Sequence, residues 1–137
     1  MKTLTPGLRH RASLAVNHSL TVPAVSAALP AFADMPPVFA TAFMVGFIEA
    51  TCIEALAPYL DPGEGTVGTH VDVSHVAATA VGMLVSAEVE LVDVSGRNLR
   101  FRVQCHDGVD VISTGHHERA VINTARFLER VSAKKPA

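Results

Sequence analysis

The stretch from Phe39 to Glu49, FATAFMVGFIE, holds two residues whose chemistry differs from that of their surroundings. Its other side chains are apolar or small, so Thr41 and Glu49 place a hydroxyl and a carboxylate in or beside an apolar helix. A carboxylate in such a place can attack a carbonyl carbon or activate water as a general base. A glutamate on a solvated helix face does neither, and the stretch alone leaves both interpretations open.

Spacing limits how these two groups can act together. In one regular helix, residues eight positions apart are separated by roughly 12 Å along the axis. Two arrangements therefore remain open. Either Thr41 precedes the regular helix where the chain folds back, or Thr41 joins a site that contains Glu49 of a second subunit.

Histidines supply a further set of candidate groups. His75 follows a predicted strand and can exchange protons near neutral pH. His70 and Asp72 alternate to the strand face opposite His75, so the sequence predicts no metal site and no cofactor. His117 shares a strand face with Arg119, and a structural role at a buried edge or on the surface is expected for it.

The elements that must position these residues follow from hydrophobic periodicity. Apolar residues recur at helical spacing between about residues 36 and 60, whereas residues 10–22 and most of the chain after residue 65 alternate with period two, as half-buried strands do. Pro58 and the DPGEG turn at 61–65 end the helix. Strands are predicted at about 10–22, 67–75, 83–91, 99–105 and 109–122, with helices at about 36–60 and 124–137.

This order predicts an α+β fold in which one antiparallel sheet wraps one long central helix. The polar half of each strand alternation indicates a solvated outer face, and a helix that is apolar nearly all round needs cover on most sides. One curled sheet leaves a side open, which predicts a homodimer, with further pairing of dimers left open. Residues 1–137 are expected to form a single domain with frayed ends at 1–8 and 132–137.

Composition excludes several classes of partner. Eleven Lys and Arg residues against thirteen Asp and Glu residues favour neither nucleic acid nor an anionic membrane. No membrane span is expected, because the N-terminal segment alternates like a strand and residues 38–60 carry Glu49 and Glu54. Cys52 and Cys105 form neither a metal-type spacing nor a disulfide framework, which fits a reducing cytoplasm.

Three longer segments, FATAFMVGFIEA, APYLDPGEGTVGTHVDVSH and HDGVDVISTGHHERAVI, resemble the fluoroacetyl-CoA thioesterase family within the hotdog-fold thioesterases. The resemblance covers about residues 37–122. It implies a hotdog fold, a dimer and acyl-CoA sites at the subunit interface. By resemblance Thr41, Glu49 and His75 match the family's catalytic residues, and Gly68 and Arg119 match positions near the bound acyl group. Met35 stands where the family's enzyme has a phenylalanine lid.

The expected function is therefore hydrolysis of a short-chain acyl-CoA, with a fluoroacetyl-like acyl group among the candidates. Glu49 would act as nucleophile or as general base, and His75 would protonate the departing thiolate or assist water. Thr41 would orient Glu49 or hydrogen-bond the acyl group. The alternative is a non-catalytic hotdog dimer that binds an acyl-CoA or another small apolar ligand.

Overall fold

The computed structural model describes residues 1–136 and contains one five-stranded sheet with two α-helices. The strand order is β1-β3-β4-β5-β2, and every neighbouring pair is antiparallel. The strands are β1 (Arg9–Ala15), β2 (Glu64–Val73), β3 (Leu84–Ser95), β4 (Asn98–His106) and β5 (Val111–Asn123). The helices are α1 (Thr41–Leu56) and α2 (Thr124–Ala133), and short 3-10 helices lie at His18–Leu20, Val22–Ala24, Pro30–Phe32 and Ala57–Tyr59.

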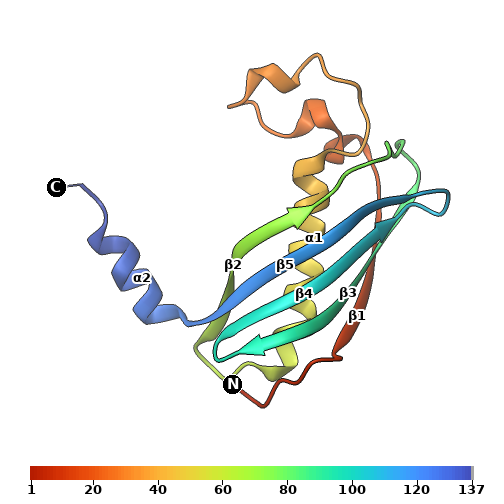
Figure 1. The fold of residues 1–137 in the computed structure, drawn as a ribbon. Coiled ribbons are helices and arrows are strands. Elements are labelled where there is room, and N and C mark those ends of the chain that lie inside the picture. Colours follow the sequence, from red (N-terminus) through yellow and green to blue (C-terminus); the bar gives the residue numbers. More distant parts are fainter. Residues whose placement is uncertain (137) are drawn as a thin grey trace.

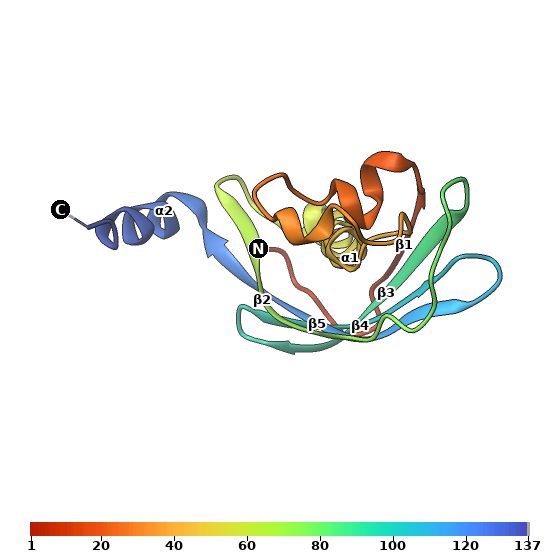
Figure 2. The ribbon, with the colours of Figure 1, turned by 90° about the horizontal axis from the view of Figure 1, so that it is seen from above.

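The sheet curls around α1, which lies in its concave face (Figures 1 and 2). Alternate residues of β3 and β4 are buried toward the helix, as the period of two in the sequence requires. The predicted antiparallel sheet around a central helix is confirmed. The core is formed by apolar residues that include Met44, Ile48, Leu56, Val85, Leu91, Phe101 and Ile112.

Residues 1–136 cover only one side of α1. Met44, Ile48 and Cys52 are buried against the sheet. The opposite side carries small and apolar residues that remain exposed, and we call them the open stripe: Ala42, Gly46, Ala50 and Ile53. A helix that is apolar on both sides but covered on one leaves hydrophobic surface in water.

Several predicted boundaries differ from the structure. β1 ends at Ala15 rather than near residue 22, because the Asn17 side chain accepts a hydrogen bond from the Ser19 N–H and starts a 3-10 turn. Likewise, α1 begins at Thr41 rather than at residues 36–37, since Phe39 still forms a β-bridge with Thr21.

The segment Thr41–Tyr59 is long and apolar enough to cross a membrane by length and hydropathy, contrary to the sequence expectation. In the structure this segment contains α1, with Met44 and Ile48 facing the sheet. Burial against a sheet is the behaviour of a core helix.

The N-terminal segment packs against the sheet, whereas the C-terminal helix α2 projects away from it. Residues 1–8, expected to fray, include the buried Leu4, and the Gly7 N–H donates to the Leu91 carbonyl. At the other end α2 projects away from the sheet, and the Asn123 side chain caps it by accepting from the Arg126 N–H (Figure 1). The expectation for residue 137 lies outside the described residues.

Candidate active site

Thr41 and His75 form a hydrogen-bonded pair at the N-terminal end of α1. His75 lies in the connection after β2, and its Nδ1 is 2.7 Å from the Thr41 hydroxyl oxygen. Ala40 occupies the helix cap, and no side chain caps this end. The Thr41 hydroxyl is therefore bonded to an imidazole rather than to its own helix, an arrangement that suits proton exchange between the two groups.

The other nitrogen of His75 has no partner in the part of the chain that the structure describes. Nε2 is buried, yet it forms no hydrogen bond with residues 1–136. Burial lowers the pKa of His75, which favours the neutral imidazole. A neutral ring with one free nitrogen can accept a proton from, or donate one to, a group that arrives there.

Glu49 belongs to a second group of residues further along α1. Its Oε1 is 3.1 Å from Arg119 Nη1 and 3.9 Å from His117 Nε2, and both residues come from β5. Gly68 of β2 completes this group, because a Cβ added there would lie 2.6 Å from the same oxygen. We call Glu49, Gly68, His117 and Arg119 the Glu49 cluster.

Arg119 is held by a third residue, Thr66, on the adjacent edge strand. Its Nε donates to the Thr66 hydroxyl at 2.9 Å, and its Nη2 donates to the Thr66 carbonyl at 3.0 Å. The arginine side chain is only 4% exposed, so these bonds and the contact with Glu49 hold a buried cation in one orientation. The register of β2 against β5 shifts immediately after the Gly68–Arg119 pair, a bulge of the kind found beside sites.

The structure separates the three residues that the sequence had grouped. Thr41 and His75 meet, but Thr41 and Glu49 both belong to the regular helix α1, eight residues apart. That separation of roughly 12 Å excludes direct contact within one chain. Of the two arrangements considered, a chain that folds back at Thr41 is therefore wrong.

His117 is the site residue whose contribution the sequence did not predict. It is fully buried beside Glu49 and Arg119 rather than at a surface. The available signal was its position two residues before Arg119 on the same strand face. That signal was weak, because nothing in the sequence showed that this face meets Glu49.

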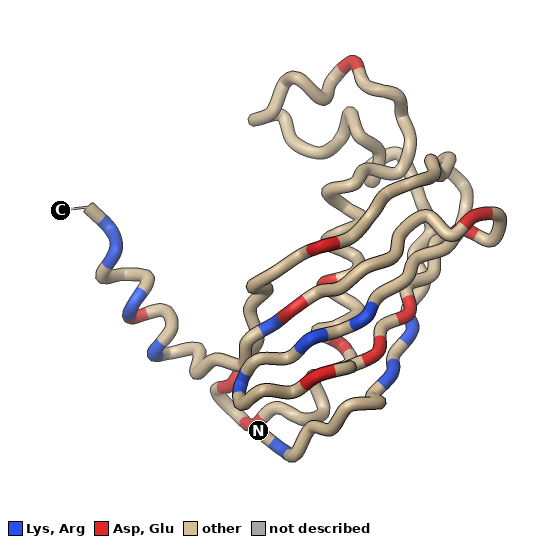
Figure 3. Tube along the Cα trace, viewed as in Figure 1, with Lys and Arg blue, Asp and Glu red and all other residues tan. Residues whose placement is uncertain are grey.

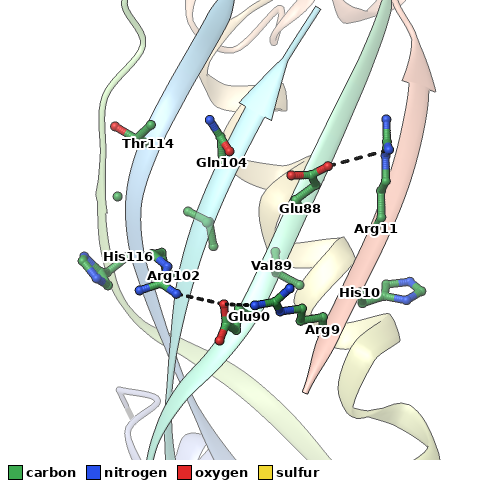
Figure 4. Close-up of a pocket in the computed structure, with 12 residues that line it drawn as sticks. Arg9, His10, Arg11, Glu88, Val89, Glu90, Arg102, Gln104, Thr114 and His116 are labelled. Atoms are coloured by element: carbon green, nitrogen blue, oxygen red, sulfur yellow. Dashed lines mark hydrogen bonds and ion pairs between the residues drawn. The ribbon is translucent and has the colours of Figure 1, made fainter. Parts of the chain in front are cut away.

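A groove of about 900 Å³ lies on the opposite side of the sheet, away from α1 (Figure 4). Charges alternate across it, and Glu90 pairs with both Arg9 and Arg102 (Figures 3 and 4). Neither Thr41 nor any member of the Glu49 cluster lines this groove. Its two carboxylates, Glu88 and Glu90, are held in ion pairs with arginines on a solvated face, and the groove therefore offers no free buried acid.

The chain resembles known proteins along most of its length. A family model described as fluoroacetyl-CoA-specific thioesterase matches residues 16–125. The chain belongs to this family. A fluoroacetyl-CoA thioesterase from Streptantibioticus cattleyicolor is 54% identical over 108 residues, which are 79% of this chain and 78% of the relative.

Solved structures agree with the family. A structure of the fluoroacetyl-CoA thioesterase FlK matches with a TM-score of 0.94 and 46% identity, covering 98% of this chain and all of the other. A hot-dog-like protein from Thermanaerovibrio acidaminovorans matches with a TM-score of 0.82 and 25% identity, covering 96% and 93% of the two chains. The predictions of a hotdog fold and of a thioester hydrolase are confirmed.

In this thioesterase the site is supported by Asp107, which lies in the turn between β4 and β5. One carboxylate oxygen accepts from the Val109 and Asp110 N–H groups at 3.0 and 2.8 Å. The other accepts from the Thr79 hydroxyl at 2.7 Å, and the Thr79 carbonyl accepts from the Phe39 N–H at 2.9 Å. Asp107 thereby ties together the turn, the connection that carries His75 and the entry to α1.

We expect Asp107→Ala to destabilise the thioesterase by about 2 kcal/mol, since it leaves the buried Thr79 hydroxyl and two N–H groups of the turn without their acceptor. Backbone hydrogen bonds, first that from Asp110, lower the pKa of Asp107. Because the folded pKa is below the unfolded value, this contribution is present above about pH 4 and is lost as pH falls through the folded pKa. Urea unfolding at several pH values checks this, with Asp110→Ala as the control. A stability gap that stays constant down to pH 2 would contradict the carboxylate's role.

Proposed function

We propose that this protein hydrolyses short-chain acyl-CoA thioesters in sites shared by two subunits. Each site would combine the Thr41–His75 pair of one subunit with the Glu49 cluster of the other. The observation that carries the proposal is the 2.7 Å Thr41–His75 contact in a thioesterase whose Glu49 lies eight residues further along the same helix. A second subunit would place its Glu49 beside the Thr41–His75 pair, which a single chain cannot do.

Two surfaces support a homodimer. The open stripe of α1 leaves apolar surface that a second copy would cover. Strand β2 is at the sheet edge, and its exposed half includes Val71, which is 45% exposed. An edge strand presents unpaired backbone groups that can pair with another strand. Both surfaces lie beside site residues, since α1 carries Thr41 and Glu49 and β2 carries Gly68.

The chemistry follows from the groups on each side. The Glu49 carboxylate would attack the thioester carbonyl and expel the CoA thiolate, and water would then cleave the resulting mixed anhydride to release the acid and restore Glu49. Alternatively, Glu49 would remove a proton from a water that attacks the carbonyl directly. His75 Nε2, which has no protein partner within residues 1–136, would deliver a proton to the CoA thiolate as it leaves. Thr41 would hold the imidazole through Nδ1, and N–H groups at the start of α1 would face the charge on the carbonyl oxygen.

A thiol-release assay over a panel of short acyl-CoAs tests the proposal. We expect turnover by the wild type and none by Glu49→Ala above the uncatalysed rate. Wild-type turnover no higher than that of Glu49→Ala would reject the function. Thermal stabilisation by CoA without turnover would then support the non-catalytic alternative.

Met35 bears on which acyl group is preferred. It is 47% exposed in the segment that leads into α1, and it is more flexible than an aromatic ring. We expect Met35→Phe to raise the preference for fluoroacetyl-CoA over acetyl-CoA about threefold to tenfold, because a rigid ring closes a pocket more selectively. The ratio of the two kcat/KM values measures this, with Met35→Leu as the matched control. An unchanged ratio in Met35→Phe would contradict the proposal that residue 35 contacts the acyl group.

We also propose a cytoplasmic location. Cys52 and Cys105 are free, buried thiols, and burial raises the pKa of each to about 12. Such thiols are inert and need no oxidising compartment. Cell fractionation with an antibody tests this, and recovery in an exported fraction would contradict it.

A further inference from the structure

His117 forms contacts that its position on a core strand does not require. Its ring is fully buried, Nδ1 is 2.8 Å from the His70 carbonyl, and Nε2 is 3.1 Å from Arg119 Nη1. Gly68 packs against the same ring, since a Cβ there would lie 3.3 Å from the His117 Cε1. The imidazole thus lies between the edge strand and the arginine that holds Glu49.

These contacts determine where the ring carries its proton. A carbonyl oxygen can only accept, so the hydrogen must be on Nδ1 for the bond to His70 to form. Arg119 can only donate, so Nε2 must present its lone pair to the guanidinium. Both bonds are satisfied by one neutral tautomer of His117, and a doubly protonated ring would place two donors face to face.

Burial and the adjacent cation favour the neutral form of the ring. Arg119 lies on one side with Glu49 beyond it, and Glu118 is the adjacent residue in β5. Burial is the largest cause of the lowered pKa of His117, and the Arg119 guanidinium lowers it further, whereas the bond to His70 and the carboxylates of Glu49 and Glu118 raise it. The buried cation therefore has a neutral acceptor beside it rather than a second cation.

His117 completes the set of acceptors that orients Arg119, beside the hydroxyl and the carbonyl of Thr66. Its Nη1 has two hydrogens, one directed to Glu49 Oε1 at 3.1 Å and the other to His117 Nε2 at 3.1 Å. Without the imidazole, one buried N–H would lose its partner, which is unfavourable. A guanidinium that turns to find another acceptor would also release Glu49.

We propose that His117 is a positioning residue which, through its unprotonated Nε2, directs Arg119 toward Glu49. This role rests on the proposed function, in which Glu49 carries out the chemistry. His117 does not touch the reacting atoms. It acts through Arg119, so its removal should lower kcat more than it raises KM.

Two substitutions separate this role from simple packing. Leu at position 117 keeps an apolar side chain but offers no acceptor, whereas Gln can place its carbonyl oxygen near the position of Nε2. We expect His117→Leu to lower kcat about tenfold with KM changed less than about twofold, and His117→Gln to recover kcat to within about threefold of the wild type. Val89→Ala, which shortens a buried residue of β3 away from Arg119, controls for lost stability.

Thermal midpoints are measured for all three variants beside the kinetics. A His117→Leu variant with wild-type kcat, or a His117→Gln variant no better than His117→Leu at equal stability, would overturn the proposal. If no wild-type turnover is found, the proposed function fails, and the role of His117 fails with it. Turnover in the wild type that survives in His117→Leu rejects the positioning role alone.

A second measurement applies even if the variants do not fold. Long-range proton–nitrogen NMR of the wild-type protein reports which ring nitrogen of His117 is protonated. We expect hydrogen on Nδ1 and none on Nε2 at neutral pH. Hydrogen on Nε2 would overturn the proposal, because that nitrogen could not accept from Arg119.

Discussion

Mixing two inactive variants, Thr41→Val and Glu49→Gln, is expected to restore about a quarter of wild-type activity, because each site of the proposed dimer takes Thr41 and Glu49 from different subunits. Random pairing makes about half of the dimers mixed, and each mixed dimer would contain one intact site and one doubly mutated site. The intact site would combine Thr41 and His75 of one subunit with Glu49 of the partner subunit. Each variant alone should lose activity on the order of a thousandfold, since Glu49→Gln removes the carboxylate that attacks or accepts a proton and Thr41→Val removes the group that holds the proton-donating His75.

Mixing purified variants requires that the subunits exchange. To avoid this requirement, the two variants are co-expressed with different affinity tags and purified through both tags. Dimers that carry both tags should then have about half of wild-type activity. Dimers formed from either variant alone provide the baseline. Doubly tagged dimers that stay at this baseline would mean that every site draws Thr41 and Glu49 from one chain, and the shared site would be wrong.

Gly68→Ala is expected to lower kcat/KM about a hundredfold, because misplacing a reacting group by about 1 Å can cost that much. The added methyl carbon would lie 2.6 Å from Glu49 Oε1 and 3.4 Å from Arg119 Nη1. The first distance is too short for non-bonded atoms, so the Glu49 carboxylate has to leave its position beside Gly68. The backbone at Gly68 is not in the left-handed region, and the fold itself should tolerate alanine.

Gly65→Ala is the matched control, since it adds the same carbon to the same strand. There the nearest atom is the Thr124 hydroxyl oxygen at 3.3 Å, far from the Glu49 cluster along β2. Steady-state kinetics on the best acyl-CoA and thermal unfolding compare the two variants. If Gly68→Ala retains activity at the level of Gly65→Ala, the close approach of Gly68 to Glu49 has no catalytic importance.

The sheet could be predicted from sequence because each strand has one buried and one solvated face. In β4, for example, Leu99, Phe101, Val103 and Cys105 are all buried while the residues between them are not. Boundaries were less predictable where a single polar side chain overrides the pattern. Asn17 ends the alternation after β1 through one hydrogen bond, which periodicity does not register.

The site was predictable only in part, for a related reason. Helical spacing correctly indicated that Thr41 and Glu49 could not touch within one regular helix. It could not indicate which strand face would meet Glu49, because that depends on the β2–β5 register and on the bulge after Gly68. The sequence therefore predicted only a structural role for His117, whereas the structure shows that its ring bonds to the His70 carbonyl and to Arg119.

The separation of the Thr41–His75 pair from the Glu49 cluster along α1 also has a consequence for how activity depends on protein concentration. If neither subunit can complete the chemistry alone, the amount of working enzyme follows mass action and falls faster than the amount of protein on dilution. Newly made chains would stay inactive until they meet a second copy. Assembly itself would then act as the switch that turns hydrolysis on.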